Sequence, residues 1–272
     1  MKLAISNIAW SASIEELAAA IMRDADVQGL EVAPTMLWPQ PLDTPEPVLE
    51  AYRDRWLDRG VRIVSLQALL FGRPELVLFA DDATRRQTAE HLRGMARLAA
   101  TLGASVMVFG SPGNRRRGDL PFEAAMNVAA SFFQSLAGQF EDLGLSLCIE
   151  GNPASYGCDF LTTTAEAREL VRRIDRQGIR LQLDTSTMTV NGEDYAKEIA
   201  ASLPFAGHFH ASEPQLAPVG TGGTDHAAAA SALRDGGYSG WVSVEMRERP
   251  EDRQLTGVEA AVTSVRRHYG AQ

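Results

Sequence analysis

The feature that most constrains the fold of this chain is a regular alternation of short apolar runs with longer amphipathic segments. Each apolar run has the length and residue content of a β-strand, and each amphipathic segment has helical periodicity. Glycine follows several of these segments, for example Gly60 and Gly103, as expected where a helix ends. The predicted strands are residues 2–8, 29–33, 61–67, 104–109, 145–150, 179–184, 205–210 and 240–245. The predicted helices are residues 13–24, 46–59, 81–102, 121–143, 164–177, 193–202, 225–234 and 255–269.

Eight strand-then-helix units follow one another with no linker-like or low-complexity segment between them. Strands that alternate with helices indicate βαβ units and a parallel sheet. Eight such units in 272 residues predict a single (β/α)8 TIM barrel domain over residues 1–272. An open doubly wound sheet is the alternative. However, no Gly-x-Gly-x-x-Gly follows the first strand, so dinucleotide binding has no support.

Composition narrows the class of protein. The content of 45% apolar and 22% charged residues is typical of a globular protein. A net charge of −9 argues against a general binder of nucleic acid or of anionic membranes. Cys148 and Cys158 match neither a disulfide framework nor a metal motif. The chain shows no signal-peptide pattern and no apolar segment of membrane-spanning length, so we expect a cytoplasmic location.

The last four predicted strands share a feature that points to function. Each begins after a residue that stops a helix and ends, five or six residues later, in a side chain that can bind a metal. These side chains are Glu150, Asp184, His210 and Glu245. In each strand the alternation places this side chain opposite the apolar row that should pack on the helices. We therefore expect all four to point into the barrel mouth, where such barrels carry their active sites.

Three carboxylates that converge would repel one another, and a divalent cation would relieve that repulsion. A set of two glutamates, one aspartate and one histidine suits Mn²⁺, Mg²⁺ or Co²⁺, and Zn²⁺ is less typical of a site with one nitrogen among oxygens. Any one of the four alone is more often an ordinary polar group, but four at matching positions favour a metal site. His208 shares a face with His210 and lies one layer deeper, where it would support the ligand rather than bind the metal.

Four segments carry a resemblance to a known family. They are Cys-Ile-Glu-Gly-Asn-Pro at 148–153, Leu-Gln-Leu-Asp at 181–184, Gly-His-Phe-His-Ala-Ser-Glu at 207–213 and Trp-Val-Ser-Val-Glu-Met at 241–246. In order and spacing they resemble the xylose isomerase-like barrels, specifically the sugar phosphate isomerase/epimerase group that includes D-tagatose and D-allulose 3-epimerases. The strand-helix rhythm extends the resemblance over essentially the whole chain.

The resemblance implies a metal-dependent isomerase or epimerase of a keto-sugar, a sugar phosphate or a related polyhydroxy compound. A Mn²⁺-type ion would be held by the four residues named above. Glu150 and Glu245 would also exchange a proton with the substrate through a metal-stabilised enediolate. The family often forms homodimers or homotetramers, which is the assembly expected here.

The chain departs from the epimerases at three positions that contact the sugar. Thr187 stands where they carry a histidine, Leu216 where they carry an arginine, and Tyr156 where they carry an acidic residue. The resemblance thus covers the metal ligands but not the set of residues that polarises the substrate.

Further polar and aromatic residues follow the predicted strands and are candidate substrate contacts. The triple arginine Arg115–Arg117 lies after the fourth strand and could bind a phosphate or carboxylate, with a solvated loop as the alternative. Packing of the rim is the alternative for Trp38, and a surface ion pair for Arg247. The candidate contacts are Asn7, Trp38, Gln67, Arg115, Asn152, Tyr156, Thr187, Glu213 and Arg247.

Three other functions remain to be weighed. A lyase of the inosose or dehydroshikimate dehydratase type would use the same scaffold and would also begin by removing a proton. An abasic-site endonuclease needs further histidines at other strand ends, and the second to fourth strands supply none. A non-catalytic sugar-binding barrel would explain the departures from the epimerase pattern but not the retained glutamates.

Overall fold

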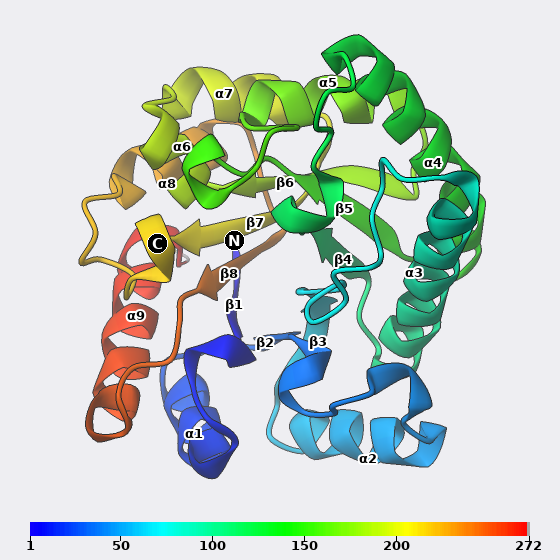
Figure 1. Cartoon of the computed structure of the whole chain (residues 1–272). Helices are drawn as coiled ribbons and strands as arrows, with labels where there is room; N and C mark the ends of the chain where they lie inside the picture. Colours follow the sequence, from blue (N-terminus) through cyan, green and yellow to red (C-terminus); the bar gives the residue numbers. More distant parts are fainter. Residues whose placement is uncertain (271–272) are drawn as a thin grey trace.

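The computed structural model describes residues 1–270 and shows a closed barrel of parallel strands surrounded by helices (Figure 1). The strands are hydrogen-bonded in chain order, and β8 closes the barrel by pairing with β1. They are β1 (Lys2–Ser6), β2 (Gly29–Val32), β3 (Arg62–Leu66), β4 (Val106–Phe109), β5 (Ser146–Glu150), β6 (Ile179–Asp184), β7 (Ala206–Ser212) and β8 (Trp241–Glu245). The predicted (β/α)8 barrel is confirmed.

The helices form the outer layer, and each of the eight predicted ones is present. The α-helices within residues 1–270 are α1 (Glu15–Asp24), α2 (Glu46–Leu57), α3 (Asp82–Leu102), α4 (Phe122–Asp142), α5 (Thr164–Ile174), α6 (Thr185–Asn191), α7 (Tyr195–Ser202), α8 (His226–Asp235) and α9 (Gln254–Tyr269). The short helix α6, directly after β6, was not predicted, because its Thr-Ser-Thr-Met-Thr-Val-Asn sequence has low helix propensity.

Predicted boundaries differ from the observed ones by up to three residues, and two of these differences have clear local reasons. Helix α5 ends three residues before the predicted end, because Asp175 adopts a left-handed conformation with φ 49° and stops the helix ahead of Gly178. Strand β1 ends at Ser6, whose hydroxyl accepts a hydrogen bond from the Ile8 amide and starts a short 3-10 helix, Asn7–Ala9.

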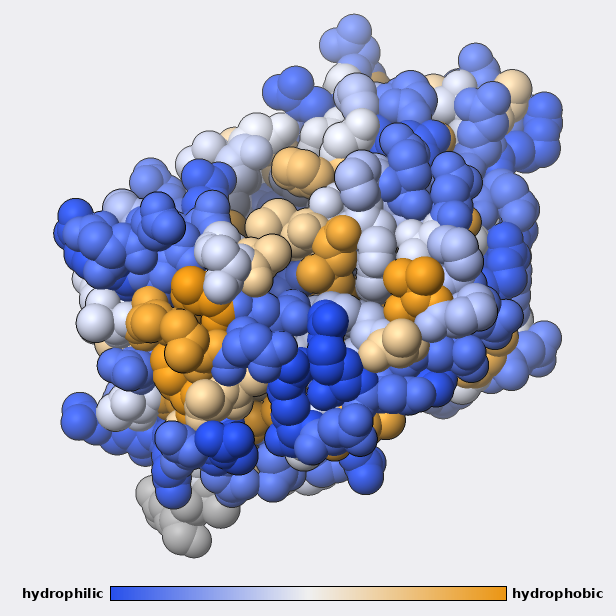
Figure 2. All heavy atoms as spheres, turned by 90° about the horizontal axis from the view of Figure 1, so that it is seen from below, coloured by the Kyte–Doolittle hydropathy of each residue, from blue (hydrophilic) through white to orange (hydrophobic). Residues whose placement is uncertain are grey.

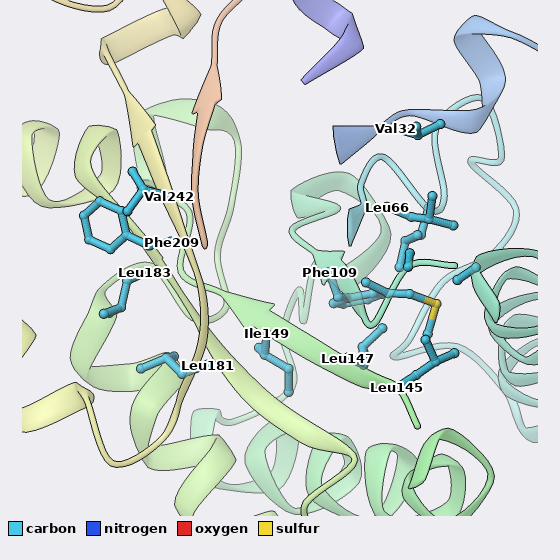
Figure 3. Close-up of a cluster of buried hydrophobic side chains, with 14 of the residues drawn as sticks. Val32, Leu66, Phe109, Leu145, Leu147, Ile149, Leu181, Leu183, Phe209 and Val242 are labelled. Carbon is cyan, nitrogen blue, oxygen red and sulfur yellow. The ribbon is translucent and has the colours of Figure 1, made fainter. Parts of the chain in front are cut away.

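The main hydrophobic core lies between the strands and the helices. The apolar residues of alternating strand positions pack there as predicted, and ten of them are labelled in Figure 3. Leu147 and Ile149 of β5 belong to this layer together with Leu145, directly before that strand, and so do Leu181 and Leu183 of β6. Because successive side chains of a strand alternate, the intervening residues must point into the barrel.

The barrel interior is lined in large part by polar side chains. Val106, Val108 and Cys148 form a small apolar cluster separate from the main core. Above it lie fully buried polar residues from β2, β3, β7 and β8, namely Glu31, Ser65, His208, His210 and Ser243. Such groups are stable inside a protein only when they are hydrogen-bonded, so this layer has a specific arrangement.

The outer surface is mostly hydrophilic. Figure 2 shows the face formed by α1 and α2, where hydrophobic groups are separated by hydrophilic ones. Leu17 of α1 and Val48 and Leu57 of α2 are among the exposed apolar residues. Across residues 1–270, no helix combines the length and the apolar character needed to cross a membrane.

Candidate metal centre

The four residues selected from the strand ends converge at one edge of the barrel. Glu150 ends β5, Asp184 ends β6, His210 lies in β7 and Glu245 ends β8. One ligand atom from each lies within 4.8 Å of the corresponding atoms of the other three. Strand β7 continues two residues beyond His210, but the register still pairs His210 with Asp184, so both ligands stand at the same height.

The ring of His210 lies between two sets of acidic groups. Its Nδ1 is 3.4 Å from Glu150 Oε1 and 3.3 Å from Glu245 Oε2. Its Nε2 is 3.1 Å from Glu31 Oε1 and 3.2 Å from Glu31 Oε2 on the opposite side. One nitrogen therefore faces the cluster of proposed ligands, and the other faces a single carboxylate inside the barrel.

The charges of this cluster are not balanced by the protein alone. Burial raises the pKa of Asp184 above its usual value, and the negative charge of Glu150 adds to the rise. Burial also raises the pKa of Glu245 to about 7, against the opposing effect of His210. Burial alone would lower the pKa of His210, but Glu31 and Glu245 raise it well above its usual value. The raised pKa values of the two carboxyl groups show that burial disfavours their negative charges, and the raised pKa of His210 shows that the carboxylates favour a positive charge at its ring.

Two atoms of the cluster have no hydrogen bond to any described residue. They are Glu150 Oε1 and His210 Nδ1, both buried and facing each other. Buried polar atoms without partners are rare and costly in proteins. A divalent cation between them would satisfy both and would offset the carboxylate charges. The donor set of three carboxylates and one imidazole fits such a cation.

Asp184 is held in place by the start of α6. Its Oδ2 accepts hydrogen bonds from the Thr187 amide and the Thr187 hydroxyl, both at 2.9 Å. Its Oδ1 accepts from the Ser186 amide at 3.2 Å and from the Ser212 hydroxyl. Thr187, a candidate substrate contact, thus lies beside the metal cluster and orients one of its ligands.

Glu150 is held by a chain of side chains from the neighbouring loops. The Asn152 amide donates to Glu150 Oε2 at 2.8 Å. Arg115 donates to Asn152 Oδ1 at 2.8 Å and to the Glu150 carbonyl at 2.5 Å. Arg115 is fully buried, so it stabilises the end of β5 from inside rather than standing on the rim. Arg117 donates to the Asp159 and Leu120 carbonyls, so it too is used within the loop.

The other candidate contacts are spread over several environments. The Asn7 side chain accepts from the Ala33 amide at 2.8 Å, and the Gln67 amide donates to Glu31 at 3.1 Å. Trp38 is half-buried and packs edge-on against Tyr52, with ring centroids 5.4 Å apart.

Glu213 lies further from the cluster and is used by its own loop. Its carboxylate is fully buried and accepts from the Gly220 amide at 2.8 Å and the Thr224 amide at 3.0 Å. It also lies 3.2 Å from His226 Nε2. These contacts fix the connection between β7 and α8.

That connection crosses the rim of the barrel and meets two further candidates. The Tyr156 hydroxyl accepts from the Gln215 amide at 2.8 Å and lies 3.1 Å from the Ser186 hydroxyl. The Arg247 amide donates to the Leu216 carbonyl at 2.9 Å, while the Arg247 side chain is exposed. Gln215 and Leu216 have φ of 59° and 56°, a conformation that non-glycine residues seldom adopt.

The sequence analysis did not identify three residues that lie at the candidate metal centre. Glu31 of β2 was not among the residues selected from the sequence. Ser212 lies two residues beyond His210 on the same strand face, a signal that could have found it. For Gly110, a Cβ would lie 2.6 Å from Glu150 Oε2, a close approach between two strands that no sequence pattern reveals.

The family model described as "Xylose isomerase-like TIM barrel" matches residues 19–267. The chain belongs to this family. Among curated relatives, a D-psicose 3-epimerase of Agrobacterium fabrum is 32% identical over 104 residues, covering 38% of this chain and 36% of that protein. An L-ribulose 3-epimerase of Methylomonas sp. is 25% identical over 173 residues, covering 63% of this chain and 57% of that protein. The matched regions thus span about a third and just over half of these relatives.

Solved structures share the fold over nearly the whole chain. A D-psicose 3-epimerase crystallised in the presence of D-fructose superposes with a TM-score of 0.84 at 19% identity, covering 100% of both chains. The IolI protein with a bound zinc atom gives a TM-score of 0.76 at 19% identity, covering 99% of this chain and 98% of that one. A probable 3-DHS dehydratase from Bacillus anthracis gives 0.74 at 15% identity, covering 97% and 98%. At these identities the likeness concerns the fold alone.

Proposed function

We propose that this family member is a divalent-metal-dependent isomerase or epimerase of a keto-sugar, a sugar phosphate or a related polyhydroxy compound. The observation that carries the proposal is the convergence of Glu150 and Glu245 on His210 Nδ1, at 3.4 and 3.3 Å. The curated relatives, which are named as sugar 3-epimerases, support the same class of reaction.

Glu150, Asp184, His210 and Glu245 would hold the cation. Mn²⁺ is the ion we propose, because three oxygen donors and one nitrogen suit it, and Mg²⁺, Co²⁺ and Zn²⁺ belong in the same test. When bound, such a cation draws electron density from substrate oxygens and so acidifies the adjacent C–H bond.

The two glutamates would move the proton. Glu245 stands at the end of β8 beside His210 Nδ1, where its carboxylate could take a proton and return it. Glu150 is fixed through Asn152 and lies in the same cluster as Glu245. One glutamate would remove a proton next to the substrate carbonyl to give an enediolate, and the other would return a proton to the opposite face.

The substrate would be bound by side chains on the rim. Trp38, Tyr156 and Arg247 are the proposed contacts, because each is half-buried or exposed and lies on a loop at the C-terminal side of the strands. The other candidates are instead buried and have side-chain hydrogen bonds within the protein, so their proposed role is to hold the site in shape; they are Asn7, Gln67, Arg115, Asn152, Thr187 and Glu213. Assembly as a homodimer or homotetramer is part of the proposal and is measured by analytical ultracentrifugation.

A dehydratase reaction on the same metal centre is the second candidate. The hydrogen bonds of Thr187 favour this reaction. The epimerases have a histidine at this position that contacts the sugar, whereas the Thr187 hydroxyl is used by Asp184 and the Gly151 carbonyl. After proton removal, the other glutamate would donate a proton to the departing hydroxyl so that it leaves as water, instead of returning a proton to carbon. An unsaturated or deoxy product distinguishes this reaction from epimerisation.

The test combines metal analysis of the purified protein with proton exchange in D₂O. The Mn²⁺-loaded protein should exchange an α-proton of at least one compound in a panel of keto-sugars, sugar phosphates and polyhydroxy acids. Glu150→Gln and Glu245→Gln should each reduce this exchange by about 10²-fold or more. Glu248→Gln is the matched control, because Glu248 is exposed and lies three residues beyond Glu245. A metal-loaded protein that exchanges no proton across the panel contradicts the proposal.

A further inference from the structure

Glu31 is a buried carboxylate at the centre of the polar layer inside the barrel. It projects from β2 and is fully inaccessible to solvent. Its Oε2 accepts from the Ser65 hydroxyl at 2.7 Å and lies 3.0 Å from His208 Nε2. Its Oε1 accepts from the Gln67 amide at 3.1 Å and from the Ser243 hydroxyl at 3.4 Å. With His210, donors from three other strands and the loop after β3 therefore converge on this one residue.

His210 connects Glu31 to the metal cluster. A neutral imidazole carries its proton on one nitrogen and a lone pair on the other. Because Glu31 accepts from Nε2, the proton is held there, and Nδ1 presents its lone pair toward Glu150 and Glu245. The opposite tautomer would place an N–H against the cation and a lone pair against a carboxylate.

We infer that Glu31 is the positioning residue of the metal centre, fixing both the tautomer and the ring orientation of His210 so that Nδ1 binds the cation. This inference rests on the proposed function and extends it to a residue of β2, which lies two strands away from β8 and its proposed ligand Glu245. Ligating histidines commonly donate their second N–H to a carboxylate, which raises their basicity and sets the ring plane.

The neighbouring histidine shows why the arrangement is specific. His208 lies 3.0 Å from the same oxygen of Glu31, and its ring is 5.5 Å from that of His210 at an interplanar angle of 81°. Yet His208 Nδ1 has no hydrogen bond to any residue in the described chain and is not among the four converging ligands. One carboxylate thus anchors both rings, but only His210 is turned toward the cluster.

The first experiment measures Mn²⁺ binding to metal-free protein by calorimetric titration, without any substrate. Glu31→Gln should weaken Mn²⁺ binding by about 10- to 100-fold, the effect typical of removing such a partner. Ser243→Ala is the matched control, because it removes a donor to the same carboxylate while leaving the hydrogen bond between Glu31 and His210 in place, and it should change the affinity by less than about threefold. Thermal unfolding of the metal-free variants shows whether each remains folded.

The second measurement uses the wild-type protein, so it tests the inference even if the Glu31→Gln variant does not fold. In protein labelled with ¹⁵N-histidine and loaded with diamagnetic Zn²⁺, His210 should retain a slowly exchanging Nε2 proton while Nδ1 shows the shift of a metal-bound nitrogen. Two outcomes would overturn the role of Glu31 and leave the proposed reaction intact. In one, Zn²⁺ is bound through His210 Nε2. In the other, the Glu31→Gln variant binds Mn²⁺ as tightly as wild type. Wild-type protein that binds neither ion overturns the metal centre itself.

Discussion

Gly110 illustrates how closely single residues define the metal centre. It lies at the end of β4, next to the carboxylate of Glu150. A Cβ at this position would lie 2.6 Å from Glu150 Oε2 and 3.4 Å from Asn152 Oδ1. The first distance is too short for any real contact, so the glutamate would have to move away from the cluster. A glycine is needed here for space and not for its backbone conformation.

Gly110→Ala should therefore damage the site while preserving the barrel. We expect Mn²⁺ affinity and the rate of proton exchange to fall at least tenfold, because a displacement on the order of 1 Å can cost about 10²-fold in rate. Calorimetric titration and the D₂O assay measure the two effects. Gly113→Ala is the matched control, since a Cβ there meets no atom within 4 Å. Equal losses in both variants would contradict the steric argument.

The titration of Glu245 gives a second prediction at this scale. Burial raises its pKa from 4.5 to about 7 in the metal-free protein. Between these values the folded protein holds a proton that the unfolded chain has released, so the free energy of unfolding falls as pH rises. We expect the stability of metal-free wild type relative to Glu245→Gln to decrease between about pH 5 and pH 8, by at most roughly 2–3 kcal/mol.

Urea unfolding of both proteins in the presence of a chelator, repeated across this pH range, measures that difference. Comparison with the variant cancels the contributions of other titrating groups to the free energy of unfolding. Among these groups are His91 and His226, whose lowered pKa values make stability rise with pH. A difference that stays constant with pH would show that Glu245 titrates at its ordinary value.

At the scale of elements, helix α6 links the fold to the metal centre. Asp184 is both the last residue of β6 and the residue that caps α6 through the amides of Ser186 and Thr187. Thr187 adds its hydroxyl to the same carboxylate oxygen. The helix therefore orients the ligand, and in return the ligand stabilises a helix that its own sequence would not form.

Thr187→Val should weaken metal binding moderately. The change keeps the β-branched shape but removes a hydroxyl that contacts Asp184 Oδ2 and the Gly151 carbonyl. A hydrogen bond of this kind contributes about 0.5–1.5 kcal/mol, so Mn²⁺ affinity should fall about three- to tenfold in a calorimetric titration. Thr189→Val is the control, because Thr189 lies on the same helix and bonds to the Thr185 carbonyl instead of Asp184. Unchanged affinity in Thr187→Val would show that the Thr187 hydroxyl does not help to hold Asp184 for the metal.

At the scale of the whole molecule, the metal should stabilise the barrel. The proposed ligands come from four adjacent strands, so a cation would join β5 to β8 directly. At a free concentration 100-fold above its Kd, a ligand that binds only the folded state contributes about 2.7 kcal/mol. For a domain of this size, 1 kcal/mol corresponds to about 2–4 °C in Tm.

Addition of Mn²⁺ at that concentration should raise Tm by about 5–10 °C, and excess chelator should reverse the change. Differential scanning calorimetry of the same sample in both states measures the shift. Asp184→Asn should lose most of the increase while keeping the start of α6, since asparagine also caps helices well. The same Tm with and without the ion would mean that these strand ends do not bind it.

The sequence by itself determined the architecture and the set of side chains that converge at the strand ends. Alternating apolar runs and glycine stops were enough to predict a barrel, because backbone geometry fixes the periodicities of strands and helices. The offsets of Glu150, Asp184, His210 and Glu245 were enough to predict that they meet, because the carboxyl ends of parallel strands lie at one end of a barrel. These are local patterns repeated along the chain.

The tertiary structure alone decided how each ligand is held. From its position after β4, Arg115 was predicted to lie on the rim. Its buried contacts to Glu150 and Asn152 depend on how two loops pack against each other, which the sequence does not show. Glu31 reaches His210 across the barrel interior over a separation of 179 residues. Contacts of this kind arise from packing between distant segments, and no periodicity along the chain encodes them.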